Sequence, residues 1–259
     1  MKLSVVLLLL IVSLDAIALT MGEAINIAGR QRMLSQRITQ AYILNGMQPE
    51  APRHKRVLTR SVQEFESNNK KLSAFHQAKK IRHQLKKAQA EWRPFREISL
   101  QPASKENATK LFERSNTLLL EAHTYVIQLQ QLAKHSSAEL INIAGRQRML
   151  SQRIAKNYAA KLWKISPEDA ENQLQLDLSE YSSRLNQLLD SPLNTVEITR
   201  NLRKAKDHLK YARRGLEGKM NISEKRQIQV TTGTTDLMLR NMHIITEQYT
   251  DLLNSREHL

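Results

Sequence analysis

One segment occurs twice in this chain, letter for letter. Residues 25–38 read Ile-Asn-Ile-Ala-Gly-Arg-Gln-Arg-Met-Leu-Ser-Gln-Arg-Ile, and residues 141–154 repeat them 116 positions later. Over the next 37 residues the two copies share only five identities, which are Tyr42/Tyr158, Leu58/Leu174, Glu64/Glu180, Ser67/Ser183 and Leu72/Leu188. The surroundings have diverged and the segment has not. The pattern therefore indicates a duplicated unit whose repeated segment does more than pack.

A helix through the segment separates two kinds of surface. At about 100° per residue, Ile27, Leu34 and Ile38 form an apolar stripe that can face a bundle core. Arg32 lies on another side, among small and polar neighbours three and four positions away. Gly29 inside a helix costs about 1 kcal/mol relative to Ala, so it indicates that a second helix approaches closely.

Two such helices would bring Arg32 and Arg148 together. Facing guanidinium groups form an unpaired cation pair unless an anion lies between them, and their planar N–H forks suit a small planar oxyanion. The other predicted ligand residues supply close approach or neutral hydrogen bonds and are Asn26, Asn142, Gly29, Gly145, Gln36 and Gln152.

Further residues of the repeated segment are predicted to support the site from a second layer, although for Arg37 and Arg153 a position on the bundle surface is the alternative. These are Arg37, Arg153, Ser35, Ser151, Met33 and Met149, of which the methionines are expected to be packing residues. Arg30 and Arg146 are expected to be solvated.

The segment resembles the signature of the PilJ-like domain, the N-terminal domain of type IV pilus methyl-accepting chemotaxis transducers. It is also similar to the N-x-A-G-x-x-R-M-x-S-x-R box of NarX-type nitrate/nitrite sensor kinases. The matching positions are Asn26, Ala28, Gly29, Arg32, Met33, Ser35 and Arg37, and again Asn142, Ala144, Gly145, Arg148, Met149, Ser151 and Arg153. This resemblance implies a four-helix sensor bundle that binds nitrate or nitrite at a two-fold interface, with the Arg of each R-M pair as the main ligand. Those relatives continue into a transmembrane helix and an output domain, and we expect neither here.

The fold class predicted is all-α, with two tandem antiparallel four-helix bundles over residues 19–135 and 136–259. A hydrophobic content of 41% with seven Gly and six Pro in 259 residues favours helices. Thr20/Glu23 and Ser136/Glu139 have capping-box spacing before each repeated segment. Caps and breakers predict helices at about 21–45, 53–74, 78–97, 105–134, 136–164, 167–190, 195–217 and 223–254.

The two bundles can be arranged relative to one another in two ways. In an up-down-up-down bundle the fourth helix returns to the level at which the first begins. If the chain turns at 135–137, the repeated helices pair side by side as an intrachain pseudo-dimer. If it continues straight, the bundles stack end to end, and each segment needs a partner in a homodimer. The turn is the preferred interpretation.

Residues 1–18 have the pattern of a signal peptide. Lys2 precedes an apolar run over 3–14, and Ala16-Ile17-Ala18 forms an A-x-A cleavage site. We expect export to the periplasm after cleavage at Ala18; the alternative is an N-terminal membrane anchor.

Composition limits the remaining functions. The formal charge is +15, but the basic residues are scattered and export makes nucleic acid an unexpected partner. Cysteine is absent, and no zinc, P-loop, dinucleotide or G-x-S-x-G pattern occurs, so we expect no metal site, cofactor or enzyme activity.

Two hypotheses remain. In the first, the chain is a periplasmic sensor-type protein that binds nitrate or nitrite and signals to a membrane sensor, chemoreceptor or transport protein. In the second, it is a helical adaptor that binds no small ligand and acts through protein contacts. The adaptor hypothesis requires an acidic partner for each Arg, and the repeated segment contains none.

Overall fold

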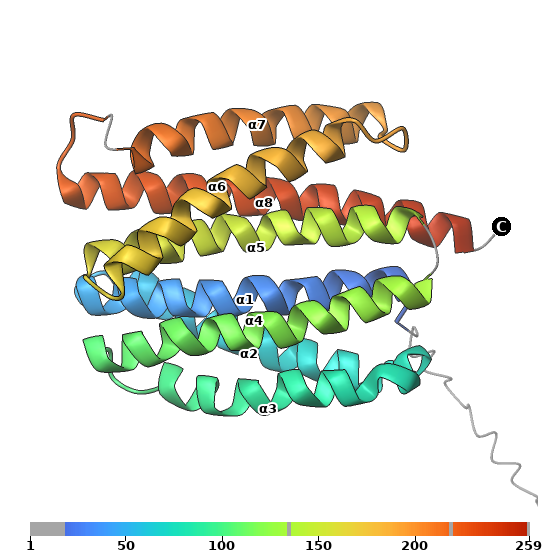
Figure 1. The fold of residues 1–259 in the computed structure, drawn as a ribbon, viewed down its shortest axis with the longest axis horizontal. Coiled ribbons are helices and arrows are strands. Elements are labelled where there is room, and N and C mark those ends of the chain that lie inside the picture. The colour runs from blue at the N-terminus through green and yellow to red at the C-terminus, as the bar shows by residue number, and fades with distance from the viewer. Residues whose placement is uncertain (1–18, 134–135, 218–219, 258–259) are drawn as a thin grey trace, which may run out of the picture.

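The computed structural model describes residues 19–133, 136–217 and 220–257, and these ranges are helical almost throughout (Figure 1). The elements are α1 (Met21–Met47), α2 (Pro52–Ala74), η1 (His76–Ile81), α3 (Arg82–Ser99), α4 (Lys105–Ala133), α5 (Ser136–Leu162), α6 (Pro167–Leu189), α7 (Val196–Leu216) and α8 (Glu224–Glu257). The described ranges contain no strand, so the all-α prediction is confirmed. The predicted signal peptide lies outside them.

Local sequence signals place the start of α1. The Thr20 hydroxyl accepts a hydrogen bond from the Glu23 amide at 3.1 Å, and the Glu23 carboxylate accepts one from the Thr20 amide at 2.8 Å. This reciprocal pair is the predicted capping box. Ser136 begins α5, but its side chain is outside the described part of the chain. The 3-10 helix η1 follows α2, so α3 begins at Arg82 and not at residue 78 as predicted.

The helices form two up-down-up-down bundles, α1 to α4 and α5 to α8, that lie side by side. Contacts between helices are most extensive between α1 and α5, which run in the same direction through the middle of the molecule (Figure 1). Helices α2 and α3 cover one outer side and α6 and α7 the other. The preferred side-by-side arrangement is therefore the observed one, although residues 134–135 of the turn lie outside the described ranges.

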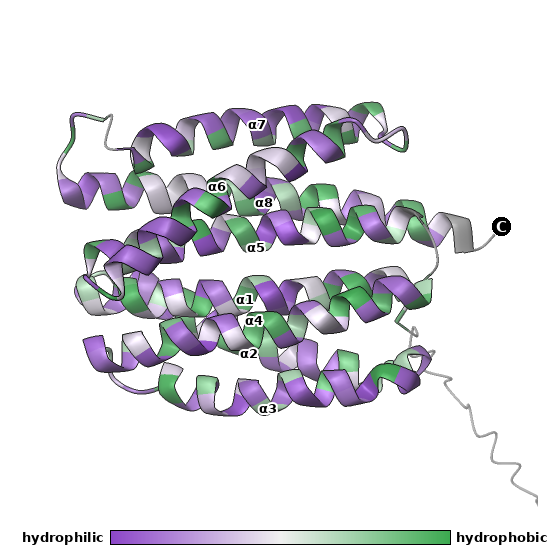
Figure 2. Ribbon diagram, viewed as in Figure 1, coloured by the Kyte–Doolittle hydropathy of each residue, from purple (hydrophilic) through white to green (hydrophobic). Residues whose placement is uncertain are grey.

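The two central helices are covered on several sides, and this decides what they bury. Helix α1 contacts α2, α4, α5 and α8. Leu34 and Ile38 are buried as predicted, whereas Ile27 is only half-buried and lines a groove beside α2. A helix surrounded by others must also bury its polar residues, and α1 does so at Asn26, Gln31, Arg32, Ser35 and Gln36. Figure 2 shows how hydrophilic residues run along all the helices, the central ones included.

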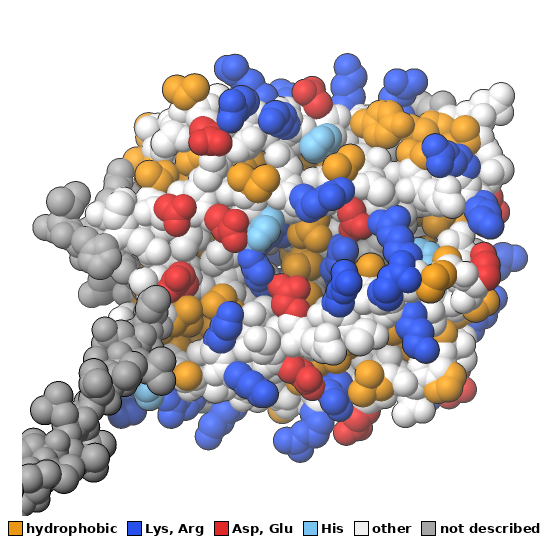
Figure 3. Space-filling model, turned by 180° about the vertical axis from the view of Figure 1, so that it is seen from behind, with side chains coloured by type: hydrophobic (Ala, Val, Ile, Leu, Met, Phe, Trp, Pro, Cys, Tyr) orange, Lys and Arg blue, Asp and Glu red, His pale blue; other side chains and the backbone are white. Residues whose placement is uncertain are grey.

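The surface is basic without forming one continuous stripe. Seen from behind, Lys and Arg side chains are spread over the molecule with Asp and Glu among them (Figure 3). None of the helices in the described ranges combines the length and apolar character needed to cross a membrane.

Candidate functional site

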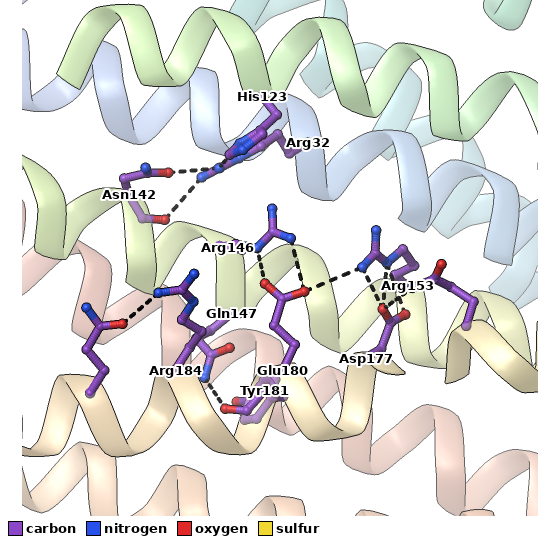
Figure 4. Close-up of polar contacts among 12 residues, drawn as sticks. Arg32, His123, Asn142, Arg146, Gln147, Arg153, Asp177, Glu180, Tyr181 and Arg184 are labelled. Carbon is purple, nitrogen blue, oxygen red and sulfur yellow. Dashed lines mark hydrogen bonds and ion pairs between the residues drawn. The ribbon is translucent and has the colours of Figure 1, made fainter. Parts of the chain in front are cut away.

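Arg32 on α1 and Arg148 on α5 are buried in the interface between the bundles, with 0% and 1% of their surface exposed. Each guanidinium reaches across to the opposite helix. Arg32 donates from Nη1 to Oδ1 of Asn142 at 2.8 Å and from Nη2 to the Asn142 carbonyl at 3.2 Å (Figure 4). Arg148 donates from Nη2 to the Asn26 carbonyl at 3.1 Å. The two bonds from Nη2 to an asparagine carbonyl are equivalent and are related by the pseudo-two-fold axis of the duplication.

Gly29 and Gly145 provide the room for both side chains. A Cβ atom added to Gly29 would lie 3.3 Å from Nη2 of Arg148 and 3.4 Å from Nη2 of Arg32. One added to Gly145 would lie 3.2 Å from Nη2 of Arg32 and 3.3 Å from Nη2 of Arg148. Both guanidinium groups therefore converge on the same small space above the paired glycines, which explains why Gly stands inside these helices.

No carboxylate lies within ion-pair distance of either guanidinium in the part of the chain that the structure describes. Their hydrogen-bond partners there are neutral groups. Burial, followed by the charges of neighbouring arginines, lowers the pKa of Arg32 and of Arg148 to about 9. The Nε–H groups of both are buried and have no acceptor among the described residues. The site is thus a buried pair of cations with unused hydrogen-bond donors.

Two histidines that the sequence analysis missed complete the surroundings of this Arg pair. Nη1 of Arg32 lies 3.0 Å from Nδ1 of His123 on α4, and Nη1 of Arg148 lies 3.4 Å from Nδ1 of His243 on α8. The histidines are 120 positions apart, so a comparison at the fixed offset of 116 does not align them. Aligning the fourth helix of each repeat separately would have revealed the pair.

The predicted Gln and Ser residues are buried but lie one turn further along the helices. Ser35 and Ser151 donate to the carbonyls of Arg32 and Arg148, at 2.9 and 2.7 Å. Gln36 and Gln152 donate to carbonyls of the fourth helices, Ser115 at 3.0 Å and Thr235 at 3.4 Å. These contacts tie the arginine-bearing turns to α4 and α8. Met33 and Met149 are buried in the hydrophobic core.

The asparagines of the repeated segment differ between the two copies. Asn142 accepts from Arg32 through its side chain and donates to Oε1 of Gln130 at 2.6 Å. The side-chain Oδ1 of Asn26 is buried and has no hydrogen-bond partner in the described ranges. Asn26 instead accepts from Arg148 through its backbone carbonyl.

The family model described as "Type IV pili methyl-accepting chemotaxis transducer N-term", PilJ, matches residues 16–117 and 131–217. Each matched part contains one copy of the repeated segment. The chain belongs to the PilJ family. The N-terminal domains of this family are sensory and typically periplasmic, and the family is not a family of enzymes. Membership therefore indicates a role in sensory signalling. No curated protein and no solved structure gave a significant match.

The environment of Arg30 and Arg146, two further arginines of the repeated segment, differs from the prediction. Arg30 and Arg146 were expected to be solvated, but both are about three-quarters buried and ion-paired to the second helix of their own bundle. Arg30 lies 3.3 Å from Glu64, and Arg146 binds both oxygens of Glu180. These glutamates are one of the five identities between the repeats, so the ion pair is itself duplicated.

Arg37 and Arg153 lie five positions after Arg32 and Arg148, and their partners differ between the bundles. Arg37 donates to Asp236 at 2.7 Å and to Oε1 of Gln152 at 2.7 Å, which joins α1 to the second bundle. Arg153 binds the buried Asp177 at 2.6 Å (Figure 4).

Lys156 breaks the pseudo-symmetry, because Gln40 occupies the same place in the first copy. Its ammonium is buried and donates to Ser115 Oγ and Asn116 Oδ1, both at 3.1 Å. It also lies 4.4 Å from the centre of the Phe112 ring. Burial, and then the charge of Arg153, lowers the pKa of Lys156 to about 7.

Among the described residues, no group of three His, Asp or Glu side chains is placed to share a metal ion.

Proposed function

We propose that this PilJ-family chain binds one small planar oxyanion, nitrate or nitrite, between Arg32 and Arg148. The observation that carries the proposal is the convergence of two buried guanidinium groups over paired glycines, with no carboxylate of the described residues within ion-pair distance. Buried like charges repel by a few kcal/mol or more at the effective dielectric of proteins, on the order of 4 kcal/mol at 4 Å. An anion between them converts this repulsion into two charge-assisted contacts.

The hydrogen-bonding groups of the site favour a ligand that accepts hydrogen bonds and donates none. Guanidinium groups only donate, and both buried Nε–H groups lack a protein acceptor in the described ranges. The oxygens of nitrate or nitrite can accept from them. The guanidinium groups stand close together above the glycines, so a small planar ion such as nitrate or nitrite needs less separation of them than tetrahedral sulfate or phosphate does.

We further propose that the protein is exported and reports anion occupancy to a membrane sensor, chemoreceptor or transport protein. The signal-peptide pattern of residues 1–18 and the sensory character of the family support this assignment. Because α1 and α5 belong to one chain, the ligand-binding unit is an intrachain pseudo-dimer, and we expect one anion per chain. The adaptor hypothesis loses support, because none of the described carboxylates lies within ion-pair distance of either arginine.

The test is a thermal-shift and calorimetric titration of the purified chain with nitrate, nitrite, chloride and sulfate. A ligand that binds only the folded state stabilises it by about 2.7 kcal/mol at a hundredfold excess over Kd. We expect saturable stabilisation by nitrate or nitrite, weaker effects of the other ions, and a stoichiometry of one.

Variants locate the site. Arg32→Gln and Arg148→Gln should each remove the anion response while the far-ultraviolet circular dichroism stays helical. Arg60→Gln, at an exposed Arg on α2, controls for the loss of one positive charge and should bind as the unmodified chain does. No response to any anion, or an unchanged response in both site variants, would contradict the proposal.

A further inference from the structure

His123 and His243 are equivalent residues that contact the Arg pair from the two fourth helices. Each presents Nδ1 to Nη1 of the site arginine of its own bundle, at 3.0 and 3.4 Å. Because a guanidinium can only donate, Nδ1 of His123 accepts from Arg32, so this imidazole is neutral with its proton on Nε2. Guanidinium donors reach both ring nitrogens of His243, Arg148 at Nδ1 and Arg30 at Nε2, so this imidazole is also neutral. Its Nε2 also lies 3.1 Å from Oε1 of Glu247.

The charged groups around these imidazoles are mostly cations. Those facing His123 are Arg32 from α1, Arg146 and Arg153 from α5, and Glu180 from α6. Those facing His243 are Arg30 from α1, Arg148 from α5 and Glu247 from α8 itself. Arg30 is close, with Nη2 at 2.8 Å from Nε2 of His243. Burial first, and then these arginines, lower the pKa of both histidines to about 4.

An anion at the Arg pair would change this balance. It adds a negative charge next to the cations that oppose protonation, so the pKa of each neighbouring imidazole must rise when the anion binds. A protonated Nδ1 becomes a donor and gives up its bond from the arginine, but an oxyanion supplies acceptor oxygens in the same place. Proton and anion therefore favour one another.

We propose that anion binding between Arg32 and Arg148 is coupled to proton uptake by His123 and His243, so that the site holds its anion more tightly in acid. The proposal rests on the function proposed above and assigns the two histidines as positioning residues of that site. The direction follows from linkage: the bound form holds more protons than the free form, so Kd falls as pH decreases through the pKa of the bound form.

Calorimetric titration of the full chain with sodium nitrate between about pH 5 and pH 8 tests this coupling. Repeating each titration in two buffers of different ionisation enthalpy counts the protons taken up. We expect affinity to increase by about tenfold from pH 8 to pH 5, with uptake of a fraction of a proton near pH 5, since a tenfold change corresponds to one proton over one pH unit.

The double variant His123→Gln, His243→Gln identifies the groups responsible. Gln keeps an acceptor oxygen for each arginine but does not titrate, so nitrate should still bind, with Kd unchanged across the same pH range. His83→Gln, at an exposed His on α3, is the control and should keep the full pH dependence. If the double variant does not fold, the two single variants and the proton count of the unmodified chain decide the question.

The outcomes separate this inference from the function on which it rests. Nitrate binding with the same Kd at all pH values, weaker binding in acid, or undiminished pH dependence in the double variant would overturn the coupling and leave the anion site standing. Absence of nitrate binding at every pH would overturn both.

Discussion

Gly29 and Gly145 lie face to face across the α1 and α5 interface, where a Cβ atom on Gly29 would stand 3.9 Å from the Cα of Gly145. The glycines let two parallel helices approach, and the space that their missing side chains leave is where Arg32 and Arg148 meet. A pairing that relatives are expected to make between two chains occurs here within one.

Substituting either glycine by alanine should remove anion binding without unfolding the protein. The added methyl group of Gly29→Ala would lie 3.3 Å from Nη2 of Arg148, which is tight enough to displace the guanidinium. Alanine also favours helix by about 1 kcal/mol, so stability without anion should change by less than about 1 kcal/mol. Thermal unfolding with and without nitrate measures both effects.

Gly233 on α8 is the matched control for this prediction. A Cβ atom there would meet nothing within 4 Å, so Gly233→Ala should stabilise the chain by about 0.5–1 kcal/mol and leave the nitrate response intact. Nitrate binding by Gly29→Ala and Gly145→Ala at unchanged affinity would show that the anion does not use the space above the glycines.

Glu180 and Glu64 are equivalent residues of the two repeats, and substituting them should lower the free energy of unfolding by different amounts. Burial raises the pKa of Glu180, but the hydrogen bond and charge of Arg146 outweigh this and hold it below the usual value. Glu180→Gln removes the carboxylate that Arg146 binds, whereas Arg153 keeps Asp177, so the substitution should lower the free energy of unfolding by about 1–2 kcal/mol. Arg30 keeps Glu247 at 3.4 Å, so Glu64→Gln should cost less than about 0.5 kcal/mol.

Urea unfolding at neutral and acid pH tests this pair of variants. Because the folded-state pKa of Glu180 is lowered, its stabilisation is present above the pKa of the unfolded chain and is lost as pH falls through the folded-state value. The difference between Glu180→Gln and the unmodified chain should therefore shrink in acid. Equal costs for the two variants would argue against unequal compensation of the arginines.

Lys156 should make the protein more stable in mild alkali. Its folded-state pKa is about 7 and the ordinary value is 10.5, so between these values the unfolded chain binds the proton and the folded chain does not. Stability then rises with pH, by at most about 1.4 kcal/mol per pH unit. The effect is cleanest below the pKa of about 9 of the two site arginines.

Lys156→Gln installs the residue that the first copy carries at position 40 and removes the titrating group. Urea unfolding at about pH 7 and pH 8.5 should show a smaller increase for this variant than for the unmodified chain. An identical increase in both would assign the alkaline stabilisation to another group.

The repeated segment, its helical character and the role of Arg32 and Arg148 as paired residues could be predicted because they depend on local information. Apolar spacing and the Thr20 capping box determine where a helix runs, and exact duplication singles out the residues to pair. Arg30 and Arg146 were wrongly expected to be solvated, since helix spacing does not show that each meets a glutamate 34 positions away on the next helix.

By itself the sequence determined the all-α class, the approximate helix boundaries and membership of the Arg pair in a duplicated unit. Only the tertiary structure decided that α1 and α5 lie side by side and that His123 and His243 contact the arginines. It also decided that the two guanidinium groups converge with no described carboxylate within ion-pair distance. The physical reason is that hydrogen-bonding periodicity acts over a few residues. The charge and burial of a side chain instead depend on helices more than a hundred positions away, which come together only when the bundles pack.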